Sequence, residues 1–246
     1  MNRIAIAGKE VPRLGLGTMR LTGPGTWGQP ADPAGAVALL RTAVHDLGVL
    51  HIDTADAYGP HTVEELIRRA LHPYPEPLLL ATKVGMVRPA PNIWRPLGRP
   101  EYLRAAVEAS LRRLGAEQLD LCYLHRVDPA VPLADQLGEL AALRQEGKIG
   151  EIGLSKVTPD QVREADGLLP VAAVQNVLNV TEPDDPTLAY CMVNGIPYVP
   201  YRPLNAGKLP DPAAALRWLL DLSPMVAPIP GTANPIHLRA LFAPES

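Results

Sequence analysis

Short apolar runs alternate along the chain with longer segments in which apolar residues recur every three or four positions. Runs rich in Val, Ile and Leu predict buried strands, and the longer period predicts helices with one apolar face. Eight strands are predicted in this way, over residues 13–17, 50–55, 78–84, 119–125, 149–155, 171–178, 196–203 and 226–230. A helical segment follows each strand, and residues 4–9 predict a small β-hairpin ahead of the first one.

Nearly continuous apolar strands are typical of a parallel sheet that helices cover, and eight strand–helix units are the number that closes into a barrel. No change of composition divides the chain into separate parts. We therefore predict an α/β fold, a (β/α)8 TIM barrel that forms a single domain over residues 1–246. In such a barrel the active site lies at the C-terminal ends of the strands.

An open dinucleotide-binding sheet is the alternative α/β fold. That fold needs a GxGxxG sequence after its first strand and a helix directly behind it. Gly15 and Gly17 supply two of the glycines, but the third position holds Arg20 and no helix follows at once. The sequence therefore favours the barrel.

Composition and charge point to a small-molecule partner. Apolar residues make up 47% of the chain and the formal net charge is −3, with neither sign gathered in a tail. This balance is typical of a folded protein that does not bind nucleic acid. No apolar run approaches the roughly 18 residues of a membrane span, and no apolar signal segment opens the chain. With Cys122 and Cys191 both in apolar segments, we expect a cytoplasmic protein, monomeric or homo-oligomeric, that binds no membrane.

Ionisable side chains stand at the ends of three neighbouring predicted strands. Asp53 and Lys83 each end an apolar run, and because a buried charge is costly unless it is paired, we expect them to form an ion pair. The ammonium group then favours the phenolate of Tyr58 and lowers the pKa of that side chain, which makes it a general acid near neutral pH. His125 is expected to hold a substrate carbonyl oxygen by a hydrogen bond.

The same strand ends leave two other kinds of site open. His51 and Asp53 point to one face of a strand, and together with His125 and Asp128 they form a candidate metal site for hydrolysis. Lys83 is a candidate for a Schiff base, as in an aldolase. Neither alternative accounts for the tyrosine. The polar residues at the ends of the later strands are Ser155, Lys156, Gln175, Tyr201 and Thr232.

Short motifs in a fixed order resemble those of the aldo-keto reductases. They are LGLGTM at 14–19, IDTADAYG at 52–59, ATK at 81–83, LH at 124–125, IGLS at 152–155, VQN at 174–176, YRPL at 201–204 and IPGT at 229–232. The resemblance extends over about residues 11–241. The segments YGPH at 58–61 and VTPDQV at 157–162 are most similar to bacterial members of the pyridoxal reductase type.

This resemblance implies an NADPH-dependent reductase that converts an aldehyde or ketone to an alcohol. The implied catalytic tetrad is Asp53, Tyr58, Lys83 and His125. The implied cofactor-binding residues are Thr18, Asp53, Ser155, Lys156, Gln175, Tyr201, Leu204, Lys208, Gly231, Thr232 and His237. By the same resemblance Tyr201 stacks on the nicotinamide, the turn at Gly231 and Thr232 faces the phosphate end of the cofactor, and no metal is bound.

The sequence departs from the family pattern mainly in the cofactor-binding segments. Lys156 stands where relatives carry an amide, and His237 stands where many carry an arginine. Neutral histidine cannot form the bidentate clamp of arginine, so Lys208 or Arg239 is expected to compensate. Only six residues separate Leu204 from the next predicted helix. We also expect the pocket to lack the C-terminal helix and loop that shape it in many relatives.

Two functional hypotheses follow. The preferred one is the carbonyl reductase. The alternative is a barrel of the same family that binds the cofactor weakly and works as an isomerase, cyclase or dehydratase, or as a binding subunit. Trp27 and Trp94, in the loops after the first and third strands, are candidate walls of the substrate pocket.

Overall fold

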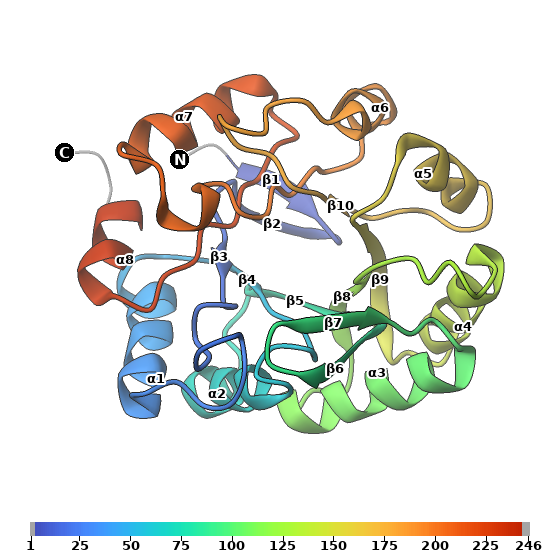
Figure 1. The fold of residues 1–246 in the computed structure, drawn as a ribbon, viewed down its shortest axis with the longest axis horizontal. Helices are drawn as coiled ribbons and strands as arrows, with labels where there is room; N and C mark the ends of the chain where they lie inside the picture. The colour runs from blue at the N-terminus through green and yellow to red at the C-terminus, as the bar shows by residue number, and fades with distance from the viewer. Residues whose placement is uncertain (1–2, 243–246) are drawn as a thin grey trace.

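The computed structural model describes residues 3–242, and it shows a curled sheet surrounded by helices (Figure 1). The strands are β1 (Arg3–Ile6), β2 (Lys9–Pro12), β3 (Leu16–Gly17), β4 (His51–Asp53), β5 (Leu79–Val84), β6 (Met86–Ala90), β7 (Ile93–Pro96), β8 (Leu119–Leu124), β9 (Ile149–Ser155) and β10 (Val174–Gln175). The helices are α1 (Pro33–Arg41), α2 (Thr62–Leu71), α3 (Pro100–Leu114), α4 (Leu133–Gln145), α5 (Pro159–Asp166), α6 (Pro186–Asn194), α7 (Pro212–Leu222) and α8 (Pro235–Phe242). A π-helical turn, η1 (Thr42–Asp46), continues α1, and a 3-10 turn, η2 (Asn205–Gly207), precedes α7. Between residues 3 and 242 no helix combines the length and the apolar character that crossing a bilayer requires.

Six parallel strands form the central sheet, in the order β10-β9-β8-β5-β4-β3. Neighbouring strands are in register, with Asp53 beside Ala81 and Lys83 beside Tyr123. The parallel α/β architecture predicted from the alternating pattern is therefore confirmed. The C-terminal ends of all six strands meet at one edge of the sheet.

The two strands predicted over 196–203 and 226–230 are wrong as regular strands. Each segment makes only isolated parallel bridges, which join Val174 to Tyr198, Val177 to Tyr201 and Tyr198 to Val226. Proline lacks the N–H that a ladder hydrogen bond needs, and the prolines in or beside these two segments are Pro197, Pro200, Pro203, Pro224, Pro228 and Pro230. Gly15 and Gly17 donate their backbone N–H to the carbonyl oxygens of the second segment, at 3.1 and 3.0 Å. The segments thus link the two edges of the sheet through a few hydrogen bonds.

Apolar residues form two cores, one on each face of the curled sheet. The larger core lies between the strands and the surrounding helices. The smaller core lies inside the curl and includes Leu79, Ala81 and Leu121 from the strands, together with Ile4 and Val11 from the antiparallel pair β1 and β2. Side chains alternate along a strand, so Leu79, Ala81 and Lys83 of β5 all point to the inner face of the sheet. Leu79 and Ala81 belong to the smaller core, and Lys83 follows them near the C-terminal end of the strand.

An antiparallel pair, β6 and β7, was not expected from the sequence. It leaves the sheet directly after β5 and returns to α3. Asn92 at its turn has a φ of +61°, a left-handed conformation that asparagine tolerates. This hairpin carries Trp94 toward the C-terminal ends of the strands, where the candidate residues lie.

Candidate active site

The candidate tetrad and its neighbours come from the ends of adjacent strands. Asp53 ends β4, Lys83 lies one residue before the end of β5, and His125 follows β8 directly. Ser155 and Gln175 end β9 and β10 and are paired with each other in the sheet register. The strand order therefore gathers residues that are up to 122 positions apart in the sequence.

A buried ion pair between Lys83 and Asp53 forms the centre of the site, as predicted. The Lys83 ammonium Nζ lies 2.5 Å from Asp53 Oδ1 and 2.8 Å from the carbonyl oxygen of Thr54, and it lies 3.4 Å from the Tyr58 hydroxyl. The second oxygen of Asp53 accepts a hydrogen bond from the Gln175 amide at 2.7 Å. Both charged side chains are almost completely buried, so each depends on the other for its stability.

Lys83 acts on the pKa of Tyr58 in the predicted direction, but the predicted net lowering of that pKa is wrong for this structure. Burial raises the pKa of Tyr58 above its ordinary value, and the ammonium of Lys83 opposes that effect without reversing it. Burial lowers the pKa of Lys83, but the Asp53 carboxylate outweighs burial and raises that pKa overall. At neutral pH the tyrosine therefore holds its proton and the lysine holds its charge.

His125 lies beside the tyrosine as a neutral ring. The ring centroids of Tyr58 and His125 are 6.1 Å apart, in an edge-to-face arrangement. Burial lowers the pKa of His125 well below its ordinary value, and Lys83, Lys156, Arg126 and others nearby act in the same direction. A neutral imidazole has one N–H to donate, which is what holding a carbonyl oxygen requires.

The structure gives no support to the two alternative uses of these residues. Among residues 3–242 no three His, Cys, Asp or Glu side chains are grouped closely enough to hold a metal ion. His51 is completely buried with no partner on either ring nitrogen, and Asp128 accepts hydrogen bonds from Gly98 and Ala130. Schiff-base formation needs a neutral amine, whereas Lys83 is protonated and held by three oxygen atoms.

Arg88 was missed by the sequence analysis and holds the wall of the site in place. Its guanidinium donates to the carbonyl oxygens of Gly25, Thr26, Ala57 and Ile93 at 2.8 to 3.0 Å. It also lies 3.6 Å from the centroid of the Trp94 ring. That indole is edge-to-face with the rings of both Tyr58 and His125, at 6.4 and 6.1 Å. No sequence signal singles out this arginine, because its partners are backbone carbonyls of distant loops.

A cavity of about 1440 Å³ opens from the tetrad toward α7 and α8. Of the predicted cofactor-binding residues, those that line it are Thr18, Asp53, Tyr201, Leu204, Gly231, Thr232 and His237. Gly17 and Gly231 touch at its wall, where a Cβ on Gly231 would lie 2.5 Å from the carbonyl oxygen of Gly17. Arg20, which the sequence analysis did not select, also lines the cavity and donates to the carbonyl oxygen of Ala206.

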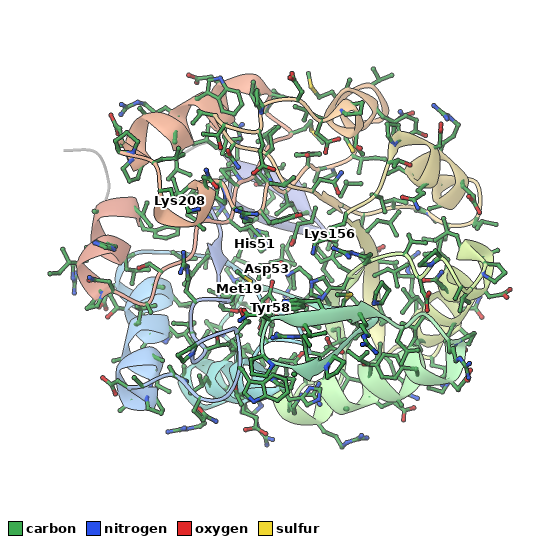
Figure 2. The ribbon with its side chains drawn as sticks, viewed as in Figure 1. Met19, His51, Asp53, Tyr58, Lys156 and Lys208 are labelled. Atoms are coloured by element: carbon green, nitrogen blue, oxygen red, sulfur yellow. The ribbon has the colours of Figure 1, made fainter. Side chains whose placement is uncertain are left out.

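Four predicted cofactor-binding residues do not line this cavity. Ser155 and Gln175 are buried at the strand ends, and Gln175 is engaged with Asp53. The ammonium of Lys156 lies over the Tyr201 ring, 5.6 Å from its centroid, and Lys208 is exposed beside η2. Figure 2 shows Lys156 and Lys208 on opposite sides of the central residues Asp53 and Tyr58.

A family model described as the aldo/keto reductase family matches residues 13–213. The chain belongs to the aldo/keto reductase family. This aldo/keto reductase is 43% identical to an uncharacterised oxidoreductase of Schizosaccharomyces pombe over 253 aligned residues. The alignment covers 96% of this chain and 82% of the yeast protein. It is 40% identical to the pyridoxine 4-dehydrogenase of Escherichia coli over 266 aligned residues. That alignment covers 99% of this chain and 93% of the dehydrogenase.

Solved structures confirm the same relationship in three dimensions. The thermostable aldo-keto reductase Tm1743, in complex with the inhibitor epalrestat, superposes with a TM-score of 0.85 at 29% identity and covers 98% of this chain and 93% of that chain. The family and its named relatives make this protein an oxidoreductase, and they support carbonyl reduction as its general chemistry.

Proposed function

We propose that this aldo/keto reductase reduces an aldehyde or ketone to an alcohol with NADPH, and that Tyr58 is the general acid. The supporting observation is the contact between the Tyr58 hydroxyl and the Lys83 ammonium, 3.4 Å apart, with Tyr58 in the lining of the large cavity. The tyrosine is protonated at neutral pH, so it can donate. The neighbouring positive charge, held by Asp53, stabilises the phenolate that remains after the donation.

The volume and lining of the cavity support the binding of a nicotinamide dinucleotide. Its volume of about 1440 Å³ exceeds that of ordinary small-molecule pockets. Tyr201 offers a ring face at one end, and the close glycine backbones of Gly17 and Gly231 leave room beside the N-terminus of α8 at the other. In this proposal the phosphates lie near Thr232 and His237.

His125 and Tyr58 bind and protonate the substrate oxygen in this proposal. His125 donates its N–H to the carbonyl oxygen and fixes the carbonyl in front of Tyr58. Trp94 closes the site above both rings and excludes water. The hydride for the carbonyl carbon comes from the reduced nicotinamide when it is bound. As negative charge develops on the oxygen, the Tyr58 proton passes to it, and the alcohol is complete.

We also infer that residues 3–242 close as one (β/α)8-type barrel in a single domain. The isolated bridges at Tyr198 and Val226 and the hydrogen bonds from Gly15 and Gly17 support this closure. In a single barrel, the residues that line the cavity from the first strands and from α8 are held in fixed positions relative to one another.

Removing the tyrosine hydroxyl tests the proposed function. The loss of NADPH absorbance is measured with a panel of aldehydes that includes pyridoxal, the aldehyde that corresponds to pyridoxine. Tyr58→Phe should lower kcat about 100- to 10,000-fold, the range for a general acid. The matched control is Tyr74→Phe, whose hydroxyl donates to the Leu114 carbonyl away from the site, and it should keep its kcat.

Two outcomes would contradict the proposal. Wild-type protein that turns over no aldehyde, or Tyr58→Phe with unchanged kcat, removes the reductase. A direct titration then examines the alternative, because NADPH binding only in the millimolar range, about −4 kcal/mol, together with conversion of a metabolite, would favour the weak-cofactor barrel. The observation behind that alternative is that Lys208 is exposed and does not line the cavity, although its neighbours Gly207 and Leu209 do.

A further inference from the structure

Three cationic residues stand directly after residues of the candidate site. They are Arg126 at the end of β8, Lys156 at the end of β9, and Arg202 in the segment that bridges to β10. Because neighbouring parallel strands end at the same edge of the sheet, the three charges gather there. The backbone of Lys156 has a φ of +56°, a left-handed conformation, and its N–H is tied to the Gln175 carbonyl at 3.1 Å. Its side chain is thereby aimed at Tyr201.

None of these three cations forms an ion pair with a carboxylate of residues 3–242. Other partly buried cations of the protein do have such partners, as with Arg113 on Glu64 and Arg144 on Glu151. The buried Arg13 and Arg88 also lack a carboxylate, but their guanidinium groups donate to backbone carbonyl oxygens. Arg126 and Lys156 have no such acceptor among residues 3–242.

The charged groups that act on Lys156 are all cations. Burial lowers its pKa to about 8, and Arg126, Lys83 and Arg202 act in the same direction with no carboxylate opposing them. The Asp53 carboxylate is already used by Lys83. Glu182 faces the neighbouring Tyr201 but is bonded to Asn179. Charges that repel one another at a half-buried site are stabilised by an anion brought between them.

We propose that Arg126 and Lys156 form an anion-binding subsite that selects aldehydes or ketones carrying a carboxylate or phosphate group. The subsite rests on the proposed reductase function, because it lies where the rest of the substrate must extend. A carbonyl oxygen placed between Tyr58 and His125 leaves the substrate chain beside Arg126, the next residue after the histidine. The planar guanidinium fits either anion with two parallel hydrogen bonds, and the lysine adds a second positive charge.

The subsite is separate from the place proposed for the cofactor phosphates. Those phosphates are assigned to the end of the cavity lined by Gly231, Thr232 and His237. Arg126 and Lys156 are not among the residues that line this cavity. Figure 2 shows Lys156 on the β9 side of the central residues, whereas Lys208 lies on the side of α7 and α8. The cofactor phosphates therefore leave the charges of the subsite uncompensated, and only the neutral carboxamide end proposed for Tyr201 would lie beside Lys156.

Matched pairs of aldehydes test this selectivity. One pair is 4-carboxybenzaldehyde and methyl 4-formylbenzoate, and the other is glyceraldehyde 3-phosphate and glyceraldehyde. We expect wild-type protein to show a kcat/KM at least about tenfold higher for the anionic member of one pair, the value of one charge-assisted hydrogen bond. The pair that shows the preference identifies the anion as carboxylate or phosphate. Equal kcat/KM values within both pairs overturn the subsite.

Substitution of the arginine locates the preference. In Arg126→Gln the ratio of kcat/KM between anionic and neutral aldehyde should fall about tenfold through the KM of the anion. Arg69→Gln removes the same charge from the exposed face of α2 and should keep the wild-type ratio. If Arg126→Gln does not fold, Lys156→Gln takes its place, with the same expected loss of ratio. An unchanged ratio in the folded variant overturns the proposal.

A binding measurement separates failure of the subsite from failure of the reductase. Calorimetric titration with benzoate and with benzamide needs no turnover. If no aldehyde is reduced but benzoate binds more tightly than benzamide, and only in protein that retains Arg126, the subsite stands and the reductase function fails. If aldehydes are reduced but benzoate and benzamide bind alike, the function stands and the subsite is overturned.

Discussion

Burial decides the protonation of single residues around the candidate tetrad. It raises the pKa of Tyr58 and lowers that of His125, so both side chains are neutral at pH 7. The ion pair of Lys83 and Asp53 is the charged element between them. The site thus holds an ammonium–carboxylate pair beneath two neutral hydrogen-bond donors, an arrangement that favours charge development on a substrate oxygen.

The buried imidazole of His51 makes stability depend on pH. Burial lowers its pKa to about 4, although Asp53 opposes this. The unfolded chain binds a proton at His51 below about pH 6.5, but the folded protein does not do so until about pH 4. Protonation therefore favours the unfolded state, and the free energy of unfolding falls as the pH drops through this interval. Between pH 7 and pH 5 the loss should be about 2 kcal/mol.

Urea unfolding at the two pH values measures this loss. His51→Asn lacks the titrating ring, so its unfolding free energy should be lower at pH 7 but should fall by about 2 kcal/mol less on going to pH 5. His125 is present in both proteins and its contribution cancels in the comparison. Equal pH dependence in wild type and variant would show that His51 does not titrate as the structure implies.

At the residue scale the sequence predicted positions better than environments. Asp53 and Lys83 could be placed together because each ends an apolar strand, and strand ends meet in this fold. The direction of the Tyr58 pKa could not be predicted, since it depends on how much water the loops and the β6–β7 hairpin remove from the hydroxyl. The same limit applies to Arg88, whose acceptors are carbonyl oxygens of residues distant in sequence.

At the scale of elements, the join between β3 and the segment around Ile229 depends on a glycine. A Cβ at Gly17 would lie 2.8 Å from the carbonyl oxygen of Ile229, a contact with backbone that cannot turn away. Gly17→Ala should therefore lower the free energy of unfolding by about 2 kcal/mol or more, which is the usual cost of an added methyl group that has no room.

A second glycine provides the control for this join. Gly138 lies on the exposed face of α4, and no atom lies within 4 Å of its missing Cβ. Gly138→Ala should raise the free energy of unfolding by about 0.5–1 kcal/mol, because alanine favours helix. Thermal and urea unfolding of both variants give the comparison. A Gly17→Ala protein as stable as wild type would mean that the two edges of the sheet are not joined closely at this point.

The Arg88 side chain joins the β6–β7 hairpin to the loops around Gly25 and Ala57. Arg88→Lys keeps the charge but loses most of the four carbonyl contacts and the stacking on Trp94. Unfolding free energy should fall by about 2–4 kcal/mol, because buried acceptors lose their donor. The KM for aromatic aldehydes should rise, since the indole wall is no longer fixed. Tryptophan fluorescence and kinetics report the two effects, and Arg69→Lys on exposed α2 is the control.

Elements were predictable where the local pattern was complete. The capping box at Thr158 and Gln161 begins α5, and left-handed Gly115 ends α3, and both are local signals of a kind that a sequence carries. The last two predicted strands became isolated bridges because proline removes the N–H groups that a ladder uses. The β6–β7 hairpin escaped prediction because its stability comes from Arg88 and from packing over the site, and neither leaves a periodic pattern.

At the scale of the whole molecule, the long cavity joins the first strands to the last helix. Its lining includes Thr18 and Asp53 near the start of the fold and Thr232 and His237 near its end. A ligand that spans it binds only the folded chain and must raise the free energy of unfolding. At a hundred times its Kd the gain is about 2.7 kcal/mol, which for a chain of this size corresponds to a rise in Tm of roughly 5–10 °C.

NADPH and NADH distinguish how the end of the cavity recognises its ligand. If His237 lies beside the phosphate that only NADPH carries, NADPH should raise Tm more than NADH at equal concentration. His237→Arg supplies a guanidinium that can hold the phosphate bidentately, so the Kd for NADPH should fall about tenfold while that for NADH stays the same. Differential scanning fluorimetry gives the Tm values and fluorescence titration the Kd values. A His237→Arg protein in which both dinucleotides gain equally would place the phosphate elsewhere, and the absence of any Tm shift with either would remove the cavity as the cofactor site.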